Sequence, residues 1–220
     1  MIKDFILLYF EVEPTSKFFA RMLRLMLMQL DYWYPEAKVH ILSNKKLADT
    51  KQVVCHHEPT LKPCWSSKFL IYGLLDRPAM YLDLDVLLVR PFSAQDLLTD
   101  YNFKVFWSSG PLYFGYNHYN NAVVWIPRPD KEITRRLALI NQLYGFWKGG
   151  EPWHANDEFA TSRYIYNNGW YMPTNGRVNV PKKLAGNYFH WFQSVHYQLN
   201  SKVDFLKDFV ILPVNRVKLL

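Results

Sequence analysis

The sequence predicts an α/β fold, in which a mixed, mostly parallel central sheet is flanked by helices and followed by a less regular C-terminal part. In the first half of the chain, short apolar runs typical of buried strands alternate with segments of helical spacing. Half of the 220 residues are hydrophobic and a fifth are charged, which is enough apolar material for a substantial core. No repeat, low-complexity tract or linker interrupts this pattern, so a single domain over residues 1–220 is expected.

The first half of the chain contains four expected strands and two expected helices. The strands cover residues 5–10, 38–42, 52–55 and 80–89, and the helices cover residues 16–30 and 66–75. The first helix is amphipathic, and its apolar side consists of Phe19, Met22, Leu23, Met26 and Leu30. Ser43-Asn44 ends the second strand, and Pro63 precedes the second helix.

The second half is less regular. Strands are expected over residues 104–107, 122–126 and 170–172, and helices over residues 130–147 and 156–166. Asp130, directly after Pro129, is the expected N-cap of the first of these helices, and Asn156 begins the second. The remainder of the chain is rich in proline and glycine and is expected to form loops.

Composition narrows the classes of partner. Lys and Arg outnumber Asp and Glu by 26 to 19, and this positive balance favours anionic partners such as nucleotide phosphates, nucleic acid or anionic lipid. The basic residues are scattered rather than grouped, so nucleic acid is not the expected partner. Cys55 and Cys64 are too few for a disulfide framework or a cysteine-rich zinc site. No apolar run is long enough for a signal-peptide core or a transmembrane segment, and a cytoplasmic location is expected.

The sharpest motif is Asp83-Leu84-Asp85, which lies within the apolar run of residues 80–89. If this run is one strand, Asp83 and Asp85 project from the same face because side chains alternate along a strand. Two neighbouring carboxylates repel each other and are costly to bury without a cation. Ligands bind at strand ends in open α/β sheets, and oxygen ligands suit a divalent metal. The motif therefore predicts a metal site at Asp83 and Asp85.

The segment from Lys68-Phe69-Leu70 to the aspartates resembles the corresponding stretch of GT-A-fold glycosyltransferases, which are Rossmann-like α/β enzymes, and in particular the glycogenin-like and bacterial lipooligosaccharide galactosyltransferase group (family 8). A fainter likeness is to the small transferases of large algal viruses. Three further blocks follow in the order of that family, and the likeness covers roughly residues 5–197. These blocks are Asn121-Ala122-Val123-Val124, Asn156-Asp157-Glu158, and His190 followed at three-residue steps by Gln193 and His196.

The resemblance implies a ligand set and a donor site. Asp83 and Asp85 would bind Mn²⁺ (or Mg²⁺), which bridges the diphosphate of a UDP-sugar, and His190 would be the third protein ligand. An imidazole ligand favours Mn²⁺ over Mg²⁺. Lys68 would approach the donor phosphate or the metal-binding carboxylates, and His196 replaces the phosphate-binding lysine of the family. The other expected donor contacts are Tyr9, where the ring either stacks on uracil or is buried in the sheet, and Glu11, Leu84 and Asn121.

The catalytic carboxylate is expected at Asp157 or Glu158. If the two residues are helical, their side chains point about 100° apart and cannot face one point equally. Glu158 falls where retaining members of the family place the side chain nearest the reacting carbon, and it would act as a nucleophile or stabilise a cationic transition state. Asp157 would orient sugar hydroxyls or the acceptor. Acidic residues in a first helical turn are also favoured by the helix dipole alone.

The resulting functional expectation is a metal-dependent, retaining hexosyltransferase that uses UDP-glucose or UDP-galactose and acts on a glycan, glycoprotein or other hydroxyl acceptor. Residues 1–90 would form the nucleotide-binding half and residues 91–220 the acceptor-binding half. Two alternatives remain. A nucleotidyltransferase that makes nucleotide sugars usually has a glycine-rich N-terminal loop, but residues 10–17 contain no glycine. A basic nucleic-acid-binding module would group its Lys and Arg side chains on one face.

Overall fold

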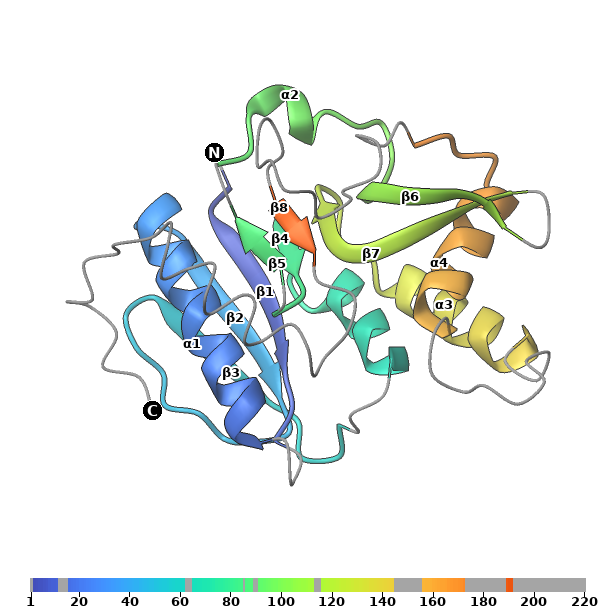
Figure 1. The fold of residues 1–220 in the computed structure, drawn as a ribbon. Helices are drawn as coiled ribbons and strands as arrows, with labels where there is room; N and C mark the ends of the chain where they lie inside the picture. Colours follow the sequence, from blue (N-terminus) through green and yellow to red (C-terminus); the bar gives the residue numbers. More distant parts are fainter. Residues whose placement is uncertain are drawn as a thin grey trace. The chain divides into compact units, whose positions relative to one another are not determined.

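The computed structural model describes residues 2–11, 16–61, 65–84, 86–88, 91–112, 116–144, 156–172 and, for the backbone alone, 189–191. The element order is β1 (Asp4–Tyr9), α1 (Ser16–Trp33), β2 (Lys38–Ser43), β3 (Val53–His57), the 3₁₀ helix η1 (Trp65–Gly73), β4 (Ala79–Leu82), β5 (Val86–Leu88), α2 (Ala94–Leu97), β6 (Lys104–Leu112), β7 (Tyr116–Ile126), α3 (Lys131–Tyr144), α4 (Asn156–Asn167) and β8 (Phe189–Trp191) (Figure 1).

The described strands form a six-stranded sheet in the order β3-β2-β1-β4-β7-β6 and a two-stranded sheet of β5 and β8. β1 pairs with β2 and β2 pairs with β3 in parallel, whereas β6 and β7 are antiparallel. The predicted α/β class with a mixed, mostly parallel sheet is therefore confirmed. The chain divides into two compact units, residues 1–61, 82–93 and 178–220, and residues 62–81 and 94–177. Each unit is described on its own.

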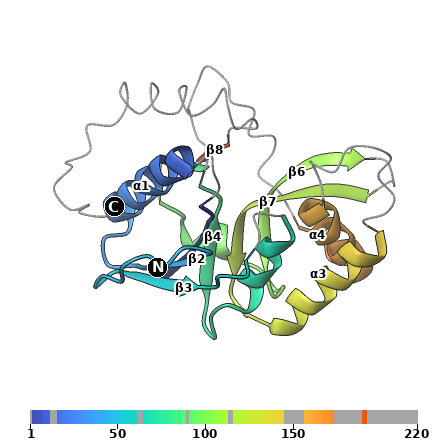
Figure 2. The ribbon, with the colours of Figure 1, turned by 90° about the horizontal axis from the view of Figure 1, so that it is seen from below.

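In the first unit, α1 covers one face of the parallel strands β1, β2 and β3 (Figure 2). β1 is buried along its whole length, as the expected fully buried strand requires. On the apolar side of α1, Met22, Leu23, Met26 and Leu30 are buried and Phe19 is half-buried. The helix continues past the expected end to Trp33. The ring of Phe5 packs 4.8 Å from that of Tyr34, just after α1.

A chain of polar side chains links the same three strands. Nε2 of His40 (β2) lies 2.9 Å from Oδ1 of Asp4 (β1), and Nδ1 of His40 lies 3.0 Å from Nε2 of His56 (β3). Asp4 and His40 are 5% and 3% exposed, so each buried polar group needs the partner that the neighbouring strand supplies.

In the second unit, the antiparallel strands β6 and β7 pack with α3, α4 and η1. The strands expected over 104–107 and 122–126 extend toward each other and form this hairpin pair. The helix expected over 66–75 is a 3₁₀ helix that ends at Gly73. A Cβ atom at Gly73 would lie 2.9 Å from Cα of Lys131, so only glycine permits this close approach to α3. Asp130 is the N-cap of α3 as predicted, because its Oδ1 accepts the Glu132 N–H at 2.8 Å.

The prediction of a short strand over residues 170–172 is wrong. α4 ends in a Schellman motif, in which the Trp170 N–H donates to the Ile165 carbonyl at 3.1 Å and the Gly169 N–H to the Tyr166 carbonyl at 3.0 Å. Gly169 has a φ of 65°, which glycine adopts without strain. The Trp170 ring then stacks on Tyr101 at 4.9 Å, so its aromatic character serves packing against the segment before β6 rather than strand pairing.

Candidate functional site

The aspartate segment is a turn between two strands, and the expectation of one continuous strand over 80–89 is wrong. β4 ends at Leu82 and β5 begins at Val86 in the other sheet. The Val86 N–H donates to the Asp83 carbonyl at 3.1 Å and closes the turn. Leu82 is fully buried but Asp83 and Leu84 are half-buried, so the chain leaves the core where the first carboxylate occurs. Asp85 lies outside the described residues. Because β4 ends at Leu82, Asp83 does not lie on the strand face on which both carboxylates were expected.

The side chains of Gln29 and Trp33 bind the main chain of Leu88 and hold the strand after the turn within the first unit. Oε1 of Gln29 in α1 accepts the Leu88 N–H at 2.7 Å. Nε1 of Trp33 donates to the Leu88 carbonyl at 3.3 Å. Because Leu88 closes β5, these two bonds fix the strand that follows the aspartates onto α1.

His190 lies on β8, which pairs with β5, the strand that follows the aspartate turn. The backbones of β5 and β8 pair antiparallel, with Leu87 opposite His190 and Val86 opposite Trp191. The sequence placed residues 189–191 in a loop-rich region, so this strand was missed. The side chain of His190 and the whole of His196 lie outside the described residues. At the level of the backbone, the late histidine and the aspartate turn flank the same short strand.

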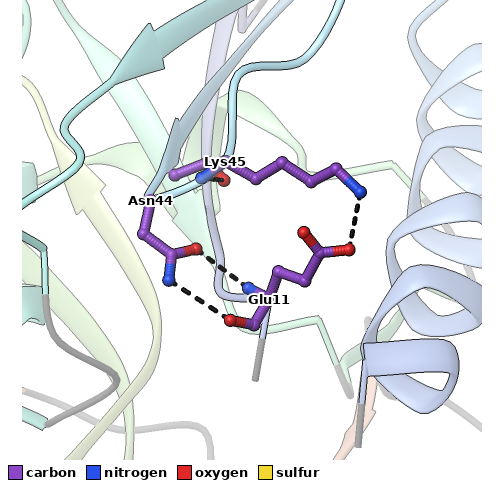
Figure 3. A network of polar contacts seen from close by, with 4 residues as sticks. Glu11, Asn44 and Lys45 are labelled. Carbon is purple, nitrogen blue, oxygen red and sulfur yellow. Dashed lines mark hydrogen bonds and ion pairs between the residues drawn. The ribbon is translucent and has the colours of Figure 1, made fainter. Parts of the chain in front are cut away.

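Two of the expected donor contacts, Tyr9 and Glu11, lie at and just after the end of β1. Tyr9 is 1% exposed, and burial is the main reason why its pKa is raised, with the Glu11 charge adding to the effect and Lys45 opposing it. Glu11 is held by two residues that follow β2 (Figure 3). Its N–H donates to Oδ1 of Asn44 at 2.9 Å, and its carboxylate accepts from Nζ of Lys45 at 2.6 Å. Of the two residues, Glu11 is the one that solvent reaches.

In the second unit, Lys68 and Asp157 form a buried ion pair. Nζ of Lys68 on η1 lies 3.2 Å from Oδ2 of Asp157 on α4, and their side chains are 6% and 5% exposed. The same ammonium donates to Oδ1 of Asn121 at 3.4 Å and lies 5.6 Å from the centre of the Tyr81 ring. Three predicted site residues, Lys68, Asn121 and Asp157, are thus brought together from η1, β7 and α4. The predicted contact of Lys68 with phosphate is not tested by this arrangement.

Asn120 binds the other acidic residue of this helix turn. Its Nδ2 donates to Oε1 of Glu158, which is half-buried. Asn121, the next residue of β7, donates through its own Nδ2 to Oγ1 of Thr161 at 3.3 Å. Asn120 and Thr161 were not among the residues expected from the sequence. The available signal was the Asn120-Asn121 pair, because asparagine is depleted in strands and two in succession suggest a reason other than strand formation.

The phenol of Tyr72 lies near the same side chains, Lys68, Asp157 and Thr161. Tyr72 on η1 is 0% exposed, and burial raises the pKa of its hydroxyl far above its ordinary value. The neighbouring Thr161 hydroxyl and the Lys68 charge act in the opposite direction, and Asp157 adds to the rise. Tyr72 is therefore a neutral neighbour of the ion pair at physiological pH.

The Lys68–Asp157 pair predicts a large stability effect. In Asp157→Asn the Lys68 ammonium would remain buried without its counter-charge, and we expect the free energy of unfolding to fall by about 3–5 kcal/mol. The double variant Lys68→Met/Asp157→Leu removes both charges and should recover most of this loss. Urea unfolding followed by circular dichroism measures both changes.

Glu132→Gln is the matched control, because Glu132 pairs with Arg136 on α3 at 3.1 Å with side chains 46% and 55% exposed. Surface pairs of this kind contribute about 0–1 kcal/mol. If Asp157→Asn lowers the unfolding free energy no more than Glu132→Gln does, the buried pair does not stabilise the fold.

Comparison with known proteins gives the fold. No protein-family model matches the chain, and no curated protein matches it in sequence. Among solved structures, the glycosyltransferase GlyE of Streptococcus pneumoniae TIGR4 is similar over 79% of the chain with a TM-score of 0.57 and 10% identity. The galactosyltransferase LgtC, in complex with donor and acceptor sugar analogues, is similar over 96% of the chain with a TM-score of 0.57 and 10% identity. An active-site variant of LgtC with glutamine replaced by glutamate gives a TM-score of 0.56.

The chain therefore has the fold of these glycosyltransferases, as the resemblance implied. It spans 98% of the LgtC chain but only 45% of GlyE. Within the residues that the structure describes, no helix is long and apolar enough to cross a membrane.

Proposed function

We propose that the chain is a metal-dependent glycosyltransferase that transfers a hexose from UDP-glucose or UDP-galactose to a hydroxyl of a glycan or glycoprotein, with retention of anomeric configuration. The observation that carries the proposal is the first turn of α4 in a glycosyltransferase fold. There, two successive acidic side chains are held by different donors, Asp157 by Lys68 and Glu158 by Asn120. Dedicated partners for each carboxylate are typical of groups that must keep one orientation.

In this proposal, Asp83, Asp85 and His190 would hold Mn²⁺ or Mg²⁺. The half-buried position of Asp83 in its turn and the pairing of His190 with Leu87 support the choice of these residues. Two carboxylates and an imidazole are ligands that suit Mn²⁺. The bound metal would offset the negative charge on the departing nucleoside diphosphate.

Several residues are proposed to contact the donor. Glu11, which follows β1, would face the nucleoside, with Asn44 and Lys45 keeping it in place. Tyr9 is 1% exposed, so the alternative that its ring is buried in the sheet is the one retained. Leu84 and Asn121 are further proposed donor contacts, and His196 would bind phosphate. Lys68 already has Asp157 as a partner at 3.2 Å, which supports a role in orienting Asp157, and its contact with phosphate stays a prediction.

The two acidic residues of α4 would have different tasks. The Lys68 ammonium offsets the charge of Asp157, which suits a residue that orients sugar hydroxyls. Asn120 is a neutral donor, so its hydrogen bond holds the Glu158 carboxylate without cancelling its charge. A carboxylate that keeps its charge can stabilise an oxocarbenium-like transition state, and we assign that task to Glu158.

A panel of nucleotide sugars, incubated with the chain and Mn²⁺ without an acceptor, tests the proposal. We expect slow hydrolysis of UDP-glucose or UDP-galactose, release of UDP, and loss of the signal on addition of a chelator. Hydrolysis that persists in the chelator would contradict metal dependence. Absence of turnover or binding with every nucleotide sugar would contradict the transferase, and pyrophosphate release from UTP and a sugar 1-phosphate would instead indicate a nucleotidyltransferase.

A further inference from the structure

Asn120 uses both ends of its side-chain amide. Oδ1 accepts the Ala122 N–H at 2.8 Å, and Nδ2 donates to Oε1 of Glu158. Asn120 is 4% exposed, so water does not easily replace either partner. The side chain therefore links a strand backbone to one carboxylate oxygen at the start of α4.

The orientation of this amide follows from its partners. A backbone N–H can only donate, so the oxygen of the Asn120 amide must face Ala122. The amide nitrogen must then face Glu158, and because an NH₂ group can only donate, Oε1 of Glu158 must be the acceptor.

The backbone of Glu158 is tied to the same strand. Oγ of Ser162 donates to the Glu158 carbonyl at 2.6 Å and accepts the Tyr119 N–H at 2.8 Å. Tyr119 and Asn120 are successive residues of β7, so one position of the strand holds the main chain of Glu158 and the next holds its carboxylate. Attachment at both points to a rigid strand fixes a side chain more closely than helix packing alone.

We propose that Asn120 is a positioning residue that holds the Glu158 carboxylate in one orientation. The inference rests on the catalytic role proposed above for Glu158, and it adds a residue that acts on the reaction only through that carboxylate. Its loss should reduce turnover while donor binding, which would depend on other groups, stays nearly unchanged.

Asn120→Asp is the sharpest test, because it keeps the size of the side chain and the acceptor for the Ala122 N–H. It replaces only the donor, and at neutral pH it sets a second carboxylate against Glu158. We expect kcat to fall about 100-fold, as for a displaced catalytic group, with the KM for the donor within about twofold of wild type. As the pH is lowered, the variant should regain activity relative to wild type, because two facing carboxylates take up a shared proton and a donor is restored.

A purely structural Asn120 would not give this relative recovery at low pH. In the swapped variant Asn120→Asp/Glu158→Gln, the amide at position 158 donates to the carboxylate at position 120. This variant should recover the stability that Asn120→Asp loses, but it should remain inactive because position 158 has no carboxylate. Asn168→Asp is the matched control, because Asn168 caps the other end of α4 through a 2.8 Å bond to the Tyr164 carbonyl. Its kcat should equal that of wild type.

The outcomes separate the inference from the proposed function. Wild-type kcat in Asn120→Asp, together with an inactive Glu158→Gln, would overturn the role of Asn120 alone. The same would follow if Asn120→Asp lost activity without recovery at low pH while its unfolding free energy fell. A fully active Glu158→Gln would overturn the role of Glu158 itself, whatever Asn120→Asp does.

Discussion

Replacing Asp83 with asparagine is expected to abolish Mn²⁺-dependent binding of UDP while the chain stays folded. Asp83 is half-buried in a turn outside the sheet, so the loss of its charge costs little packing. It removes a proposed ligand charge from a divalent ion, however. Substituting even the residues that orient a metal ligand costs about 10–100-fold in affinity, so we expect a loss of at least about 100-fold by isothermal titration calorimetry.

Asp76→Asn is the matched control for this substitution, because the Asp76 side chain is 94% exposed and pairs only loosely with Arg77 at 3.6 Å. It should bind UDP and Mn²⁺ as wild type does. Unchanged affinity in Asp83→Asn, or binding that a chelator does not affect, would contradict a metal site at the aspartate turn. Circular dichroism of each variant excludes unfolding as the cause.

His190→Ala extends the same test to the strand paired with β5. If His190 is the third ligand, its loss should weaken Mn²⁺-supported UDP binding more than Mg²⁺-supported binding, because imidazole favours Mn²⁺. Equal weakening with both ions, or none, would leave the carboxylates as the proposed ligands and remove the histidine. The pairing of His190 with Leu87 makes this residue the first histidine to test.

The elements that the sequence predicted well are those with a regular apolar pattern. β1 is buried on both faces and reads as a continuous apolar run, and α1 buries one helical side. The same reasoning failed at residues 80–89, because the apolar run continues through Leu84, Val86 and Leu88 and contains no turn residue such as glycine or proline. Only the paired carboxylates indicated that the chain leaves the core there.

The structure differs from the sequence prediction in the length of β6 and β7 and in the presence of β8, and both differences depend on contacts that sequence spacing does not reveal. β6 and β7 extend through polar residues such as Asn117 and Asn120, which lack the alternation of a half-buried strand. β8 has only three residues and is defined by its pairing with β5. The end of α4 was predictable in principle, since Gly169 is a common helix-ending signal, but the aromatic residues after it suggested a strand.

The sequence indicated which residues to consider as candidates, but not which of them contact one another. Lys68, Asn121, Asp157 and Glu158 were identified from the sequence, and the structure adds that the first three share one buried cluster. The expectation for Lys68 concerned phosphate, but its ammonium pairs with Asp157. Asn120 was missed because its role depends on the meeting of β7 and α4, which no local pattern encodes.

Glu158→Gln is expected to lower kcat by about 100–1,000-fold with little change in donor affinity. The substitution keeps the size of the side chain and an oxygen that can accept the Asn120 amide, but it removes the negative charge proposed to stabilise the cationic transition state. An interaction present mainly in the transition state lowers kcat and kcat/KM together and leaves substrate binding unchanged. Steady-state kinetics with a UDP-sugar, and calorimetry with UDP, measure the two effects separately.

Asp157→Asn should behave differently from Glu158→Gln, because its carboxylate is paired with buried Lys68. We expect weaker donor or acceptor binding and a lower unfolding free energy, so its kinetics should be measured well below its unfolding temperature. If Glu158→Gln is nearly as active as wild type and folded Asp157→Asn is inactive, the roles of the two residues are reversed. If both variants turn over normally, the acidic pair serves only to begin α4 through the helix dipole. Catalysis would then depend on the metal, the phosphate contacts and the positioning of the substrates.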